Sequence, residues 1–266
     1  MNYLMLIKER TPSVLRKIPF KAILLWGSLS VIALVTILVS AVAVDFLGDR
    51  EGLVQALNRE KQWLQGIGQE KPRPPILILA RNGEVIGEFV PVRGSRISLE
   101  SCKADMGWLK KAVVSAEDRE FYDHSGISLR GIARAMINNI LAFSVREGGG
   151  SITQQLARNL FTDHSPTLYR KIYETFAAFQ IESMMEKEEI LCLYLNRIYM
   201  GEGRVGAEEA SWFYFRKPPQ NLDAAEAAMI VGLFPSPVRY SPLNDIVLST
   251  KKQNLVLDAM QEQGEI

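Results

Sequence analysis

The sequence predicts a mainly α-helical protein with one small β-hairpin near its N-terminus and a single membrane-spanning helix before the hairpin. Three observations predict this fold class. Residues 22–44 contain no charged side chain, residues 76–92 form two apolar runs around an Asn-Gly pair, and from residue 106 onward apolar residues recur every three or four positions. The length of 266 residues allows one large domain, or one medium domain with appendages.

The composition is that of an ordinary globular chain. Apolar residues make up 47% and charged residues 23%, so extensive disorder is not expected. The formal net charge is only +1, whereas dedicated nucleic-acid binders carry a basic excess. We therefore predict no nucleic-acid partner.

Residues 22–44 form the predicted transmembrane helix and read AILLWGSLSVIALVTILVSAVAV. At about 1.5 Å per residue their length is roughly 34 Å, enough to cross a bilayer core of about 30 Å. Basic residues outnumber acids before this segment, where Glu9 stands against Lys8, Arg10, Arg16, Lys17 and Lys21. The positive-inside rule therefore predicts a cytoplasmic tail at residues 1–21 and an extracytoplasmic position for everything after residue 45.

The alternative to an anchor is a cleaved signal peptide. Its apolar core would be shorter, about 7–15 residues, and would end at a small-x-small cleavage site. Residues 40–43 read SAVA and could imitate such a site, but the apolar run that contains them is too long. We favour the anchor.

Residues 45–75 are predicted to be a stalk or linker, because they are polar and end in KPRPP, which cannot continue a helix. Leu53, Leu57 and Leu64 have the spacing to line a short helix there. The domain itself is predicted at residues 76–266 and begins with a hairpin from Ile76 to about Val92. The pair at its centre, Asn82-Gly83, suits a type I′ turn. We expect a structural ribbon without chemistry of its own.

The remainder of the domain is predicted to be helical. One helix should end near Glu117, because the apolar residues upstream share a face: Leu109, Ala112, Val113 and Ala116. A second follows Ser128 as its cap and carries an apolar stripe as far as residue 141. Further helices are expected at residues 151–161, 166–186, 190–199, 202–215, 223–233 and 246–263.

The two cysteines, Cys102 and Cys192, form no CxxC pair, and the chain has only two histidines. A Cys/His zinc site is therefore not expected. A disulfide could form outside the cytosol. Two buried free thiols are the favoured interpretation, because free cysteines are commonly buried.

Glu117 and Asp118 stand where a helix gives way to a loop, and Phe121 and His124 follow. A carboxylate beside an aromatic residue and a second acid is a candidate general base with a raised pKa. The alternative is a solvated acid pair at a helix end, which the spacing alone favours.

Three glycines at residues 148–150 lead directly into the helix that begins at Ser151. Glycine lets the backbone approach a ligand, and free N–H groups at a helix N-terminus attract an anion. Ser151, Gln155 and Arg158 fall on one face of this helix and suit a phosphate ester. A flexible loop before a surface helix is an equally supported interpretation. The motif is not a Walker loop, since no GK[ST] follows.

Arg170, Lys171 and Glu174 form a second charged face, at spacings of four and three residues. An intrahelical ion-pair set, worth about a few tenths of a kcal/mol, is the simple interpretation. The other interpretation is that the two cations hold a phosphate and that the acid is a second catalytic carboxylate.

Together these segments resemble the five motifs of the peptidoglycan glycosyltransferases, glycosyltransferase family 51. Three motifs carry the site residues: EDxxFxxHxG is matched by EDREFYDHSG, GGSTITQQLxxN by GGGSITQQLARN, and RKxxExxxAxxxE by RKIYETFAAFQIE. The fourth and fifth are matched by KEEILCLYLNRIYMGEGRVGAEEASWFYF and AAMIVGLFPSPVRYSP. All five occur in the family's order between Glu117 and Pro242. The hairpin and the C-terminal residues also resemble segments that flank this domain in bifunctional penicillin-binding proteins.

The resemblance implies a lysozyme-like α-helical fold. It also implies polymerisation of lipid II into β-1,4-linked glycan strands, with inversion at the anomeric carbon and release of undecaprenyl diphosphate. Glu117 would be the general base that deprotonates the acceptor 4-hydroxyl, and Glu174 the second catalytic carboxylate. Substrate-binding roles would fall to Asp118, Phe121, His124, Ser151, Gln155, Arg158, Asn159, Arg170 and Lys171.

The resemblance further implies partners and a location. The partners would be lipid II, the growing glycan strand, membrane lipid, and cell-wall synthesis proteins including a transpeptidase. The protein would span the bacterial inner (plasma) membrane once, with its catalytic domain outside the cytoplasm. No tightly bound cofactor is expected. A lone Glu174 without a His or Asp cluster suggests at most a loosely held Mg²⁺ or Mn²⁺, with substrate phosphates as the other ligands.

The sequence departs from the family in two places. The Ser-Thr pair of the family is Gly150-Ser151 here, which removes one hydroxyl and predicts weakened diphosphate binding with activity retained. Arg158 stands where lysine is also common, and either cation can meet a phosphate. The chain ends at Ile266 without a transpeptidase domain, so we expect a monofunctional protein or a fragment of a bifunctional one.

Two other functions fit part of the pattern. A glycan-cleaving enzyme on the same fold would need neither the diphosphate-binding residues nor a membrane anchor. A non-catalytic or weakly active adaptor in cell-wall synthesis is suggested by the altered Ser-Thr pair.

Overall fold

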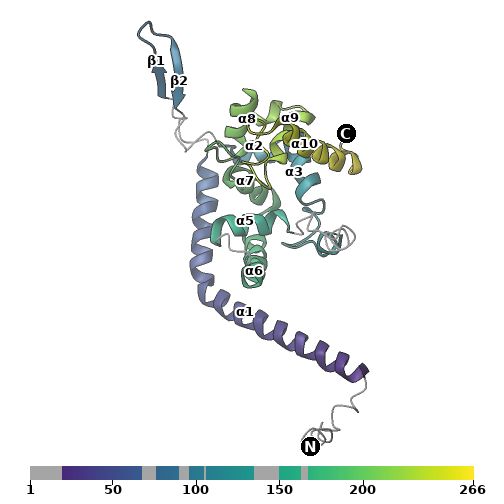
Figure 1. The fold of residues 1–266 in the computed structure, drawn as a ribbon. Coiled ribbons are helices and arrows are strands. Elements are labelled where there is room, and N and C mark those ends of the chain that lie inside the picture. Colours follow the sequence, from purple (N-terminus) through teal and green to yellow (C-terminus); the bar gives the residue numbers. More distant parts are fainter. Residues whose placement is uncertain (1–19, 68–75, 90–95, 105, 135–149, 163–166) are drawn as a thin grey trace, which may run out of the picture.

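The computed structural model describes residues 20–67, 76–89, 96–104, 106–134, 150–162 and 167–266. In this part of the chain the protein is mainly helical, with one two-stranded antiparallel sheet and a long N-terminal helix, which confirms the predicted fold class. Figure 1 shows a cluster of helices from which the N-terminal helix and the β-hairpin project in different directions.

Helix α1 runs without interruption from Phe20 to Gly66 and includes both the predicted membrane segment and most of the predicted stalk. Its apolar part is exposed along most of its length, at Trp26, Leu29, Val31, Ile32, Leu34, Val35 and Ile37. Among the described residues, α1 is the one helix long and apolar enough to cross a membrane.

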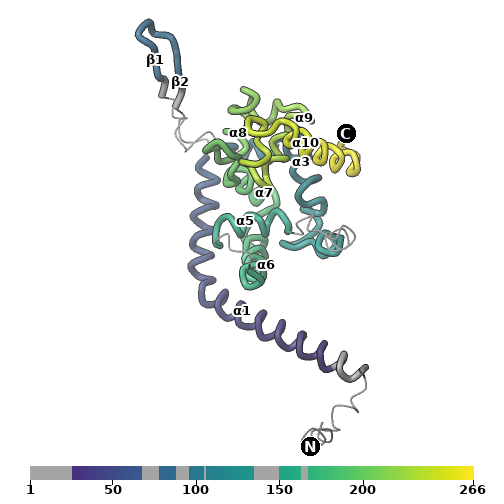
Figure 2. The backbone as a smooth tube through the Cα atoms, in the orientation of Figure 1, coloured from purple at the N-terminus to yellow at the C-terminus, as the bar shows by residue number. Residues whose placement is uncertain are grey.

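The C-terminal part of α1 packs against the helical body. Leu53, Leu57 and Leu64, which were predicted to line a short helix, are buried there. No proline interrupts residues 45–66, so the membrane segment continues directly into this apolar stripe. Figure 2 shows that α1 bends between its two parts and that the second part runs alongside the body. The backbone has no break at the predicted boundary between residues 44 and 45.

Ion pairs fix this part of α1 to the body. The Lys61 ammonium lies 2.9 Å from the Glu189 carboxylate, and the Arg197 guanidinium donates to Glu60 at 2.6 Å. The same guanidinium lies 3.9 Å from the centre of the Trp63 ring. Because these groups are partly or largely shielded from solvent, the contacts are less screened than surface pairs.

The predicted hairpin is confirmed, but the predicted turn type, I′, is wrong. Strands β1 (Ile76–Leu79) and β2 (Val85–Phe89) pair antiparallel with a register shift between residues 78 and 79. A type I′ turn needs positive φ at both central residues. Here Gly83 has φ of 83° and Asn82 has a negative φ. The Gly83 N–H donates to the Ala80 carbonyl at 2.9 Å, and the Asn82 side chain accepts from the Glu84 N–H at 3.1 Å. The loop is therefore a three-residue hairpin with a left-handed glycine.

The body consists of short helices in the predicted order. They are α2 (Leu99–Lys103), α3 (Gly107–Glu117), α5 (Ile152–Phe161), α6 (Leu168–Met184), α7 (Lys187–Arg197), α8 (Ala207–Phe215), the 3₁₀ helix η1 (Pro219–Asn221), α9 (Ala224–Gly232) and α10 (Ile246–Glu262). The predicted start after Ser128 is confirmed, because its hydroxyl accepts from the Gly131 N–H at 2.8 Å. Residues 135–141 of that helix and the glycines at 148 and 149 lie outside the described residues. Two short elements, α2 and η1, were not predicted.

Helix α8 begins five residues later than the sequence predicts. Positive φ angles at Gly201, Glu202, Gly203 and Gly206 fold the intervening segment into a tight loop. Left-handed residues cannot continue a right-handed helix, so the helix starts only at Ala207.

Helix α7 forms the centre of the body. Six consecutive residues, at positions 190 to 195, are buried. A helix that is apolar on every side has to be enclosed by protein, and α1, α2, α5, α6 and α8 all contact it. Helices α3, α9 and α10 pack together as a second layer.

Cys102 and Cys192 form a disulfide between α2 and α7, so the prediction of two free thiols is wrong. The unpredicted helix α2 lies on α7 and brings the two Cα atoms to 5.7 Å, within the range that a disulfide requires. Asn196 adds a second tie between the same segments. Its side chain accepts from the Ile97 N–H and donates to the Ile97 carbonyl, both at 2.9 Å.

Reducing the disulfide should lower the free energy of unfolding by about 2–5 kcal/mol, because the bond closes a loop that restricts the unfolded chain. Urea unfolding followed by circular dichroism, with and without a thiol reductant, measures the difference. The double variant Cys102→Ser/Cys192→Ser should match the reduced wild type and be insensitive to the reductant. Equal stability of the oxidised and reduced wild type would contradict the prediction.

Candidate active site

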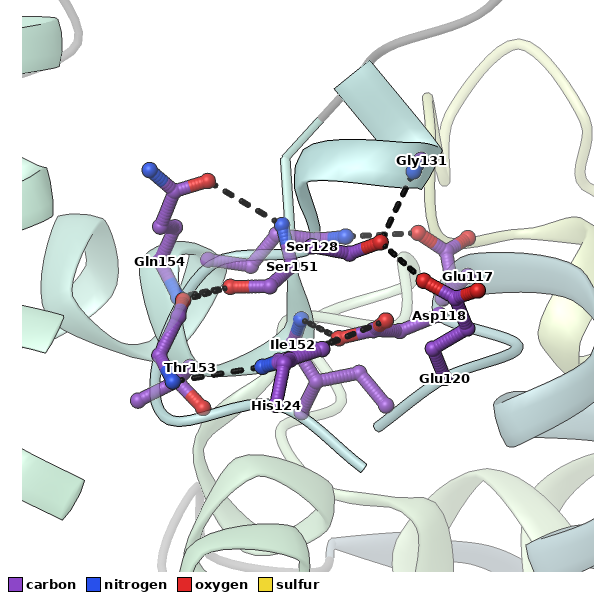
Figure 3. Close-up of polar contacts among 12 residues, drawn as sticks. Glu117, Asp118, Glu120, His124, Ser128, Gly131, Ser151, Ile152, Thr153 and Gln154 are labelled. Atoms are coloured by element: carbon purple, nitrogen blue, oxygen red, sulfur yellow. Dashed lines mark hydrogen bonds and ion pairs between the residues drawn. The ribbon is translucent and has the colours of Figure 1, made fainter. Parts of the chain in front are cut away.

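Asp118 joins the end of α3 to the beginning of α5. Its buried carboxylate accepts from the Ile152 N–H at 3.0 Å and from the His124 Nε2 at 2.9 Å (Figure 3). The His124 Nδ1 accepts from the Gly126 N–H at 3.2 Å, so the ring proton lies on Nε2, where it is donated to Asp118. One carboxylate thus fixes a helix end, a helix start and the loop between them.

The side chains of Phe121 and His124 face the interior beside the Asp118 carboxylate. Phe121 is fully buried, and its ring lies edge-on to the ring of His124 with 6.4 Å between centroids. The side chains of Phe121, His124 and Asp118 are all turned into the protein, so they support the candidate site from the interior. Direct contact of these three residues with substrate stays a prediction.

The Ser151 hydroxyl also points into the protein. Ser151 is the N-cap of α5: its Oγ accepts from the Gln154 N–H at 3.1 Å and donates to the Gly126 carbonyl. The Gln154 side chain accepts from the Ser151 N–H in return, completing a capping box (Figure 3). We expected Ser151, Gln155 and Arg158 to form one polar face, but a serine before the first turn is placed to cap it.

The N–H groups at the start of α5 are already engaged. Those of Ser151, Ile152 and Gln154 donate to Gln154, Asp118 and Ser151 respectively. The expectation of free N–H groups at this helix end, ready for an anion, is therefore wrong for these three. The side-chain cations nearby are better placed for that task.

Glu117 ends α3 as a half-buried carboxylate. Burial raises the pKa of Glu117 above its ordinary value. The Gln155 Nε2, which donates to Glu117 Oε2 at 2.7 Å, and the charge of Arg158 lower this pKa, but less than burial raises it. Asp118 raises the pKa of Glu117 further and Lys252 lowers it. A carboxylate with a raised pKa suits general base catalysis.

Tyr194 and Lys252 belong to the surroundings of Glu117, although the sequence did not point to them. The fully buried Tyr194 hydroxyl donates to Gln155 Oε1 at 2.9 Å, and Lys252 acts on Glu117 from α10. In the sequence Tyr194 reads as part of the apolar face of a helix. The sequence signal that could have indicated Tyr194 is its tyrosine hydroxyl, because such a hydroxyl usually has a hydrogen-bond partner when it is buried.

Glu174 is buried with a cation at each of its oxygens. Arg170 Nη1 lies 2.8 Å from Oε1, and Lys171 Nζ lies 3.4 Å from Oε2. The ion pairs expected from the spacing are therefore present. Two cations against one carboxylate leave a net positive charge at this point, and Lys171 is exposed enough to meet a ligand.

The glycine motif and this cationic face meet in space. A Cβ atom added at Gly150 would lie 3.1 Å from Lys171 Nζ. The Gln154 Nε2 donates to the Thr175 hydroxyl at 2.9 Å and links α5 to α6 at the same place. Two motifs that are separate in the sequence therefore border one electropositive region.

Arg158 and Asn159 lie further along α5. Arg158 is partly exposed, and its charge reaches Glu117. Asn159 is exposed on the outer side of the helix. Their roles in substrate binding stay predictions.

A resident divalent metal does not fit these residues. Both oxygens of Glu174 face cations, and a metal ion would be repelled by them. Within the described ranges, no group of three or more His, Cys, Asp or Glu side chains is arranged to hold a metal. The residues present therefore favour phosphate binding through Arg and Lys.

A further ion pair supports the loop that follows Glu117. Lys187 Nζ donates to the His124 carbonyl at 2.6 Å and to Glu182 Oε1 at 2.7 Å, and it lies 4.5 Å from the centre of the Phe121 ring. The Thr153 hydroxyl donates to the same Glu182 oxygen at 2.6 Å. This network ties α5, α6, α7 and the loop together. Glu182 ends the third motif and Lys187 begins the fourth, but the motifs did not indicate that the two residues pair.

Known proteins match the region that contains this site. The sequence profile of the family described as Transglycosylase matches residues 82–261. Penicillin-binding protein 1A of Neisseria flavescens is 36% identical over 203 residues, covering 76% of this chain and 25% of that protein. Penicillin-binding protein 1A of Pseudomonas aeruginosa is 36% identical over 192 residues, covering 72% and 23%. The crystal structure of penicillin-binding protein 1A from Haemophilus influenzae matches with a TM-score of 0.36 and 22% identity, covering 74% of this chain and 19% of that chain. The chain thus spans about a quarter of the length of the curated relatives it matches.

Asp118→Asn should lower the free energy of unfolding by about 1–3 kcal/mol, because the neutral amide loses the charge that strengthens both hydrogen bonds, and its NH₂ group cannot accept from the His124 Nε2–H as the second carboxylate oxygen does. Urea unfolding measures this loss. Asp123→Asn, at an exposed position five residues away, is the matched control and should be neutral. Similar stability of both variants would show that Asp118 does not support the site.

Proposed function

The chain belongs to the transglycosylase family, and we propose that it is a peptidoglycan glycosyltransferase. The family profile covers more than half of the chain, and the covered part includes every described residue of the candidate site. The observation that carries the proposal is that α5 is hydrogen-bonded both to the half-buried Glu117, whose pKa is raised, and to α6, which carries the cation-flanked Glu174. The first group can accept a proton, and the second holds two cations where an anion would leave.

The proposed reaction is polymerisation of lipid II into β-1,4-linked glycan strands. The acceptor is the 4-hydroxyl of one sugar, and the donor is the anomeric carbon of another that carries undecaprenyl diphosphate. The acceptor O–H bond breaks, and its proton moves to Glu117. The O4–C1 bond forms as the C1–O bond to the diphosphate breaks, with inversion at C1, and the diphosphate leaves with the electron pair.

Departure of the diphosphate needs positive charge. Arg170 and Lys171 supply it, and Glu174 holds both side chains in position through its two oxygens. Arg158 adds a third cation from α5. In this proposal Glu174 acts by orienting the cations, and no step passes through a metal ion.

The proposal includes a place in the cell. Residues 22–44 would span the bacterial inner membrane once, residues 1–21 would lie in the cytoplasm, and the domain at 76–266 would lie outside it. The exposed apolar part of α1 supports the anchor, and the Cys102–Cys192 disulfide supports an oxidising compartment for the domain. The partners would be lipid II, the growing strand, membrane lipid and cell-wall proteins including a transpeptidase.

Glu117→Gln should abolish polymerisation of labelled lipid II by the full-length protein in detergent. It should not lower stability at pH 7. Because the pKa of Glu117 is raised in the folded state, ionising this carboxyl above its unfolded pKa costs folding free energy, and glutamine removes that cost. The free energy of unfolding of the variant relative to wild type should therefore rise as pH increases from about 4, near the unfolded pKa, through the raised pKa of the folded state.

The exposed Glu100→Gln is the matched control and should polymerise like wild type. Product from Glu117→Gln at the wild-type rate would remove Glu117 as the base. If the wild type shortens preformed glycan and does not extend lipid II, the protein is a lytic enzyme. If it does neither but Gly150→Ser polymerises, the natural chain is a non-catalytic adaptor.

Gly150→Ser should lower the KM for lipid II by about three- to tenfold, because a serine hydroxyl beside Lys171 adds one contact for the diphosphate. The added Cβ requires only a small shift of the flexible end of Lys171. The lipid II polymerisation assay gives the KM. Gly150→Ala has the same steric effect without the hydroxyl, and an equal change in both variants would contradict the prediction.

A further inference from the structure

We propose that Tyr194 is a positioning residue that orients the Gln155 amide and thereby keeps Glu117 in its proton-accepting form. The proposal deepens the function above, since it rests on Glu117 as the base. Tyr194 does not touch the reacting atoms and acts only through Gln155.

The three side chains form a hydrogen-bond chain across three helices. The Tyr194 hydroxyl on α7 donates to Gln155 Oε1 on α5 at 2.9 Å. Gln155 Nε2 donates to Glu117 Oε2 at the end of α3 at 2.7 Å. Tyr194 is fully buried, and its ring lies edge-on to Phe234 with 5.8 Å between centroids, so the hydroxyl is held in place by packing.

The amide of Gln155 can in principle face Glu117 with either end. With its NH₂ toward Glu117, it donates to an ionised carboxylate. With its carbonyl toward Glu117, it requires a protonated carboxyl as donor, because an ionised one would repel it. The amide orientation is therefore coupled to the protonation state of Glu117.

Tyr194 makes the two orientations unequal. In the present orientation its hydroxyl donates to the Gln155 carbonyl. In the reversed orientation it would accept from the NH₂, and its own proton would need another acceptor. Among the described residues, Gln155 is the only hydrogen-bond partner of this hydroxyl. A buried donor without an acceptor is unfavourable, so the tyrosine selects the orientation that suits ionised Glu117.

Other charged groups face Glu117 from three elements. Arg158 on α5 and Lys252 on α10 stabilise its ionised form, and Asp118 beside it at the end of α3 opposes ionisation. These groups act through their charge, and none of them is a hydrogen-bond partner of Tyr194. Removing the tyrosine hydroxyl alone therefore tests the orientation effect without altering the charges.

The test is Tyr194→Phe in the full-length protein in detergent, with two readouts. In ¹³C-glutamate-labelled protein, the carboxyl titration assigned to Glu117 by its loss in Glu117→Gln should move to higher pH. In lipid II polymerisation, the rate on the acidic limb of the pH profile should fall by about five- to tenfold, with the high-pH plateau retained within about twofold. A merely structural role would lower the rate equally at every pH.

Two further variants complete the test. Tyr214→Phe removes another buried hydroxyl, whose charged neighbours are Glu202 and Arg204, and should leave both readouts unchanged. Gln155→Met should shift the Glu117 titration in the same direction, and Tyr194→Phe should add nothing to it. If Tyr194→Phe does not fold, the Glu117 titration of Gln155→Met still tests the inference, because an unshifted titration in that variant overturns it.

The outcomes separate this inference from the proposed function. An unshifted Glu117 titration in Tyr194→Phe or Gln155→Met overturns the inference, whatever the activity. An additive effect in the double variant also overturns it. If Tyr194→Phe shifts the Glu117 titration but the wild-type protein does not polymerise lipid II, the inference is supported and the proposed function is wrong.

Discussion

Helix α7 has to be enclosed by protein on every side, and the rest of the domain follows from that constraint. A helix with apolar residues all round cannot lie on a surface, so other helices surround it. Its few polar groups then serve as ties to different elements. Cys192 bonds to α2, Glu189 pairs with Lys61 of α1, Asn196 binds the backbone at Ile97, and Tyr194 reaches the site. One buried helix thereby positions the C-terminal part of α1, the segment at Ile97 and the candidate site.

The two candidate carboxylates differ in how their burial is compensated. Glu174 has a cation at each oxygen, whereas Glu117 has one amide donor and more distant charges. The first arrangement favours a permanently charged group that organises Arg170 and Lys171. The second raises the pKa of Glu117 and favours a group that exchanges a proton. The same residue type can thus take two roles, because the surroundings of each differ.

The connection between the apolar part of α1 and the domain is a packed helix where a stalk or linker was expected. Helix α1 continues through the polar region and buries three leucines against the body. A linker without contacts would let the site take any height and orientation relative to the bilayer. A helix fixed by packing and by the Lys61 and Arg197 ion pairs holds one relation between them. For the lipid-linked substrate proposed above, this geometry would limit where the sugar end can reach.

The sequence by itself determined the features that depend on neighbours along the chain. The apolar span, the order of helices, the Ser128 cap and the ion pairs of Glu174 all follow from local spacing, and the five motifs predicted the candidate site. The tertiary structure alone decided the contacts between distant segments. The disulfide, the Tyr194–Gln155–Glu117 chain and the bond from the Ser151 hydroxyl to the Gly126 carbonyl depend on how distant segments pack. Spacing sets which side of a helix a residue occupies, but only packing sets what that side meets. A tyrosine predicted to lie in an apolar core is therefore the hydrogen-bond partner of Gln155, which in turn binds Glu117.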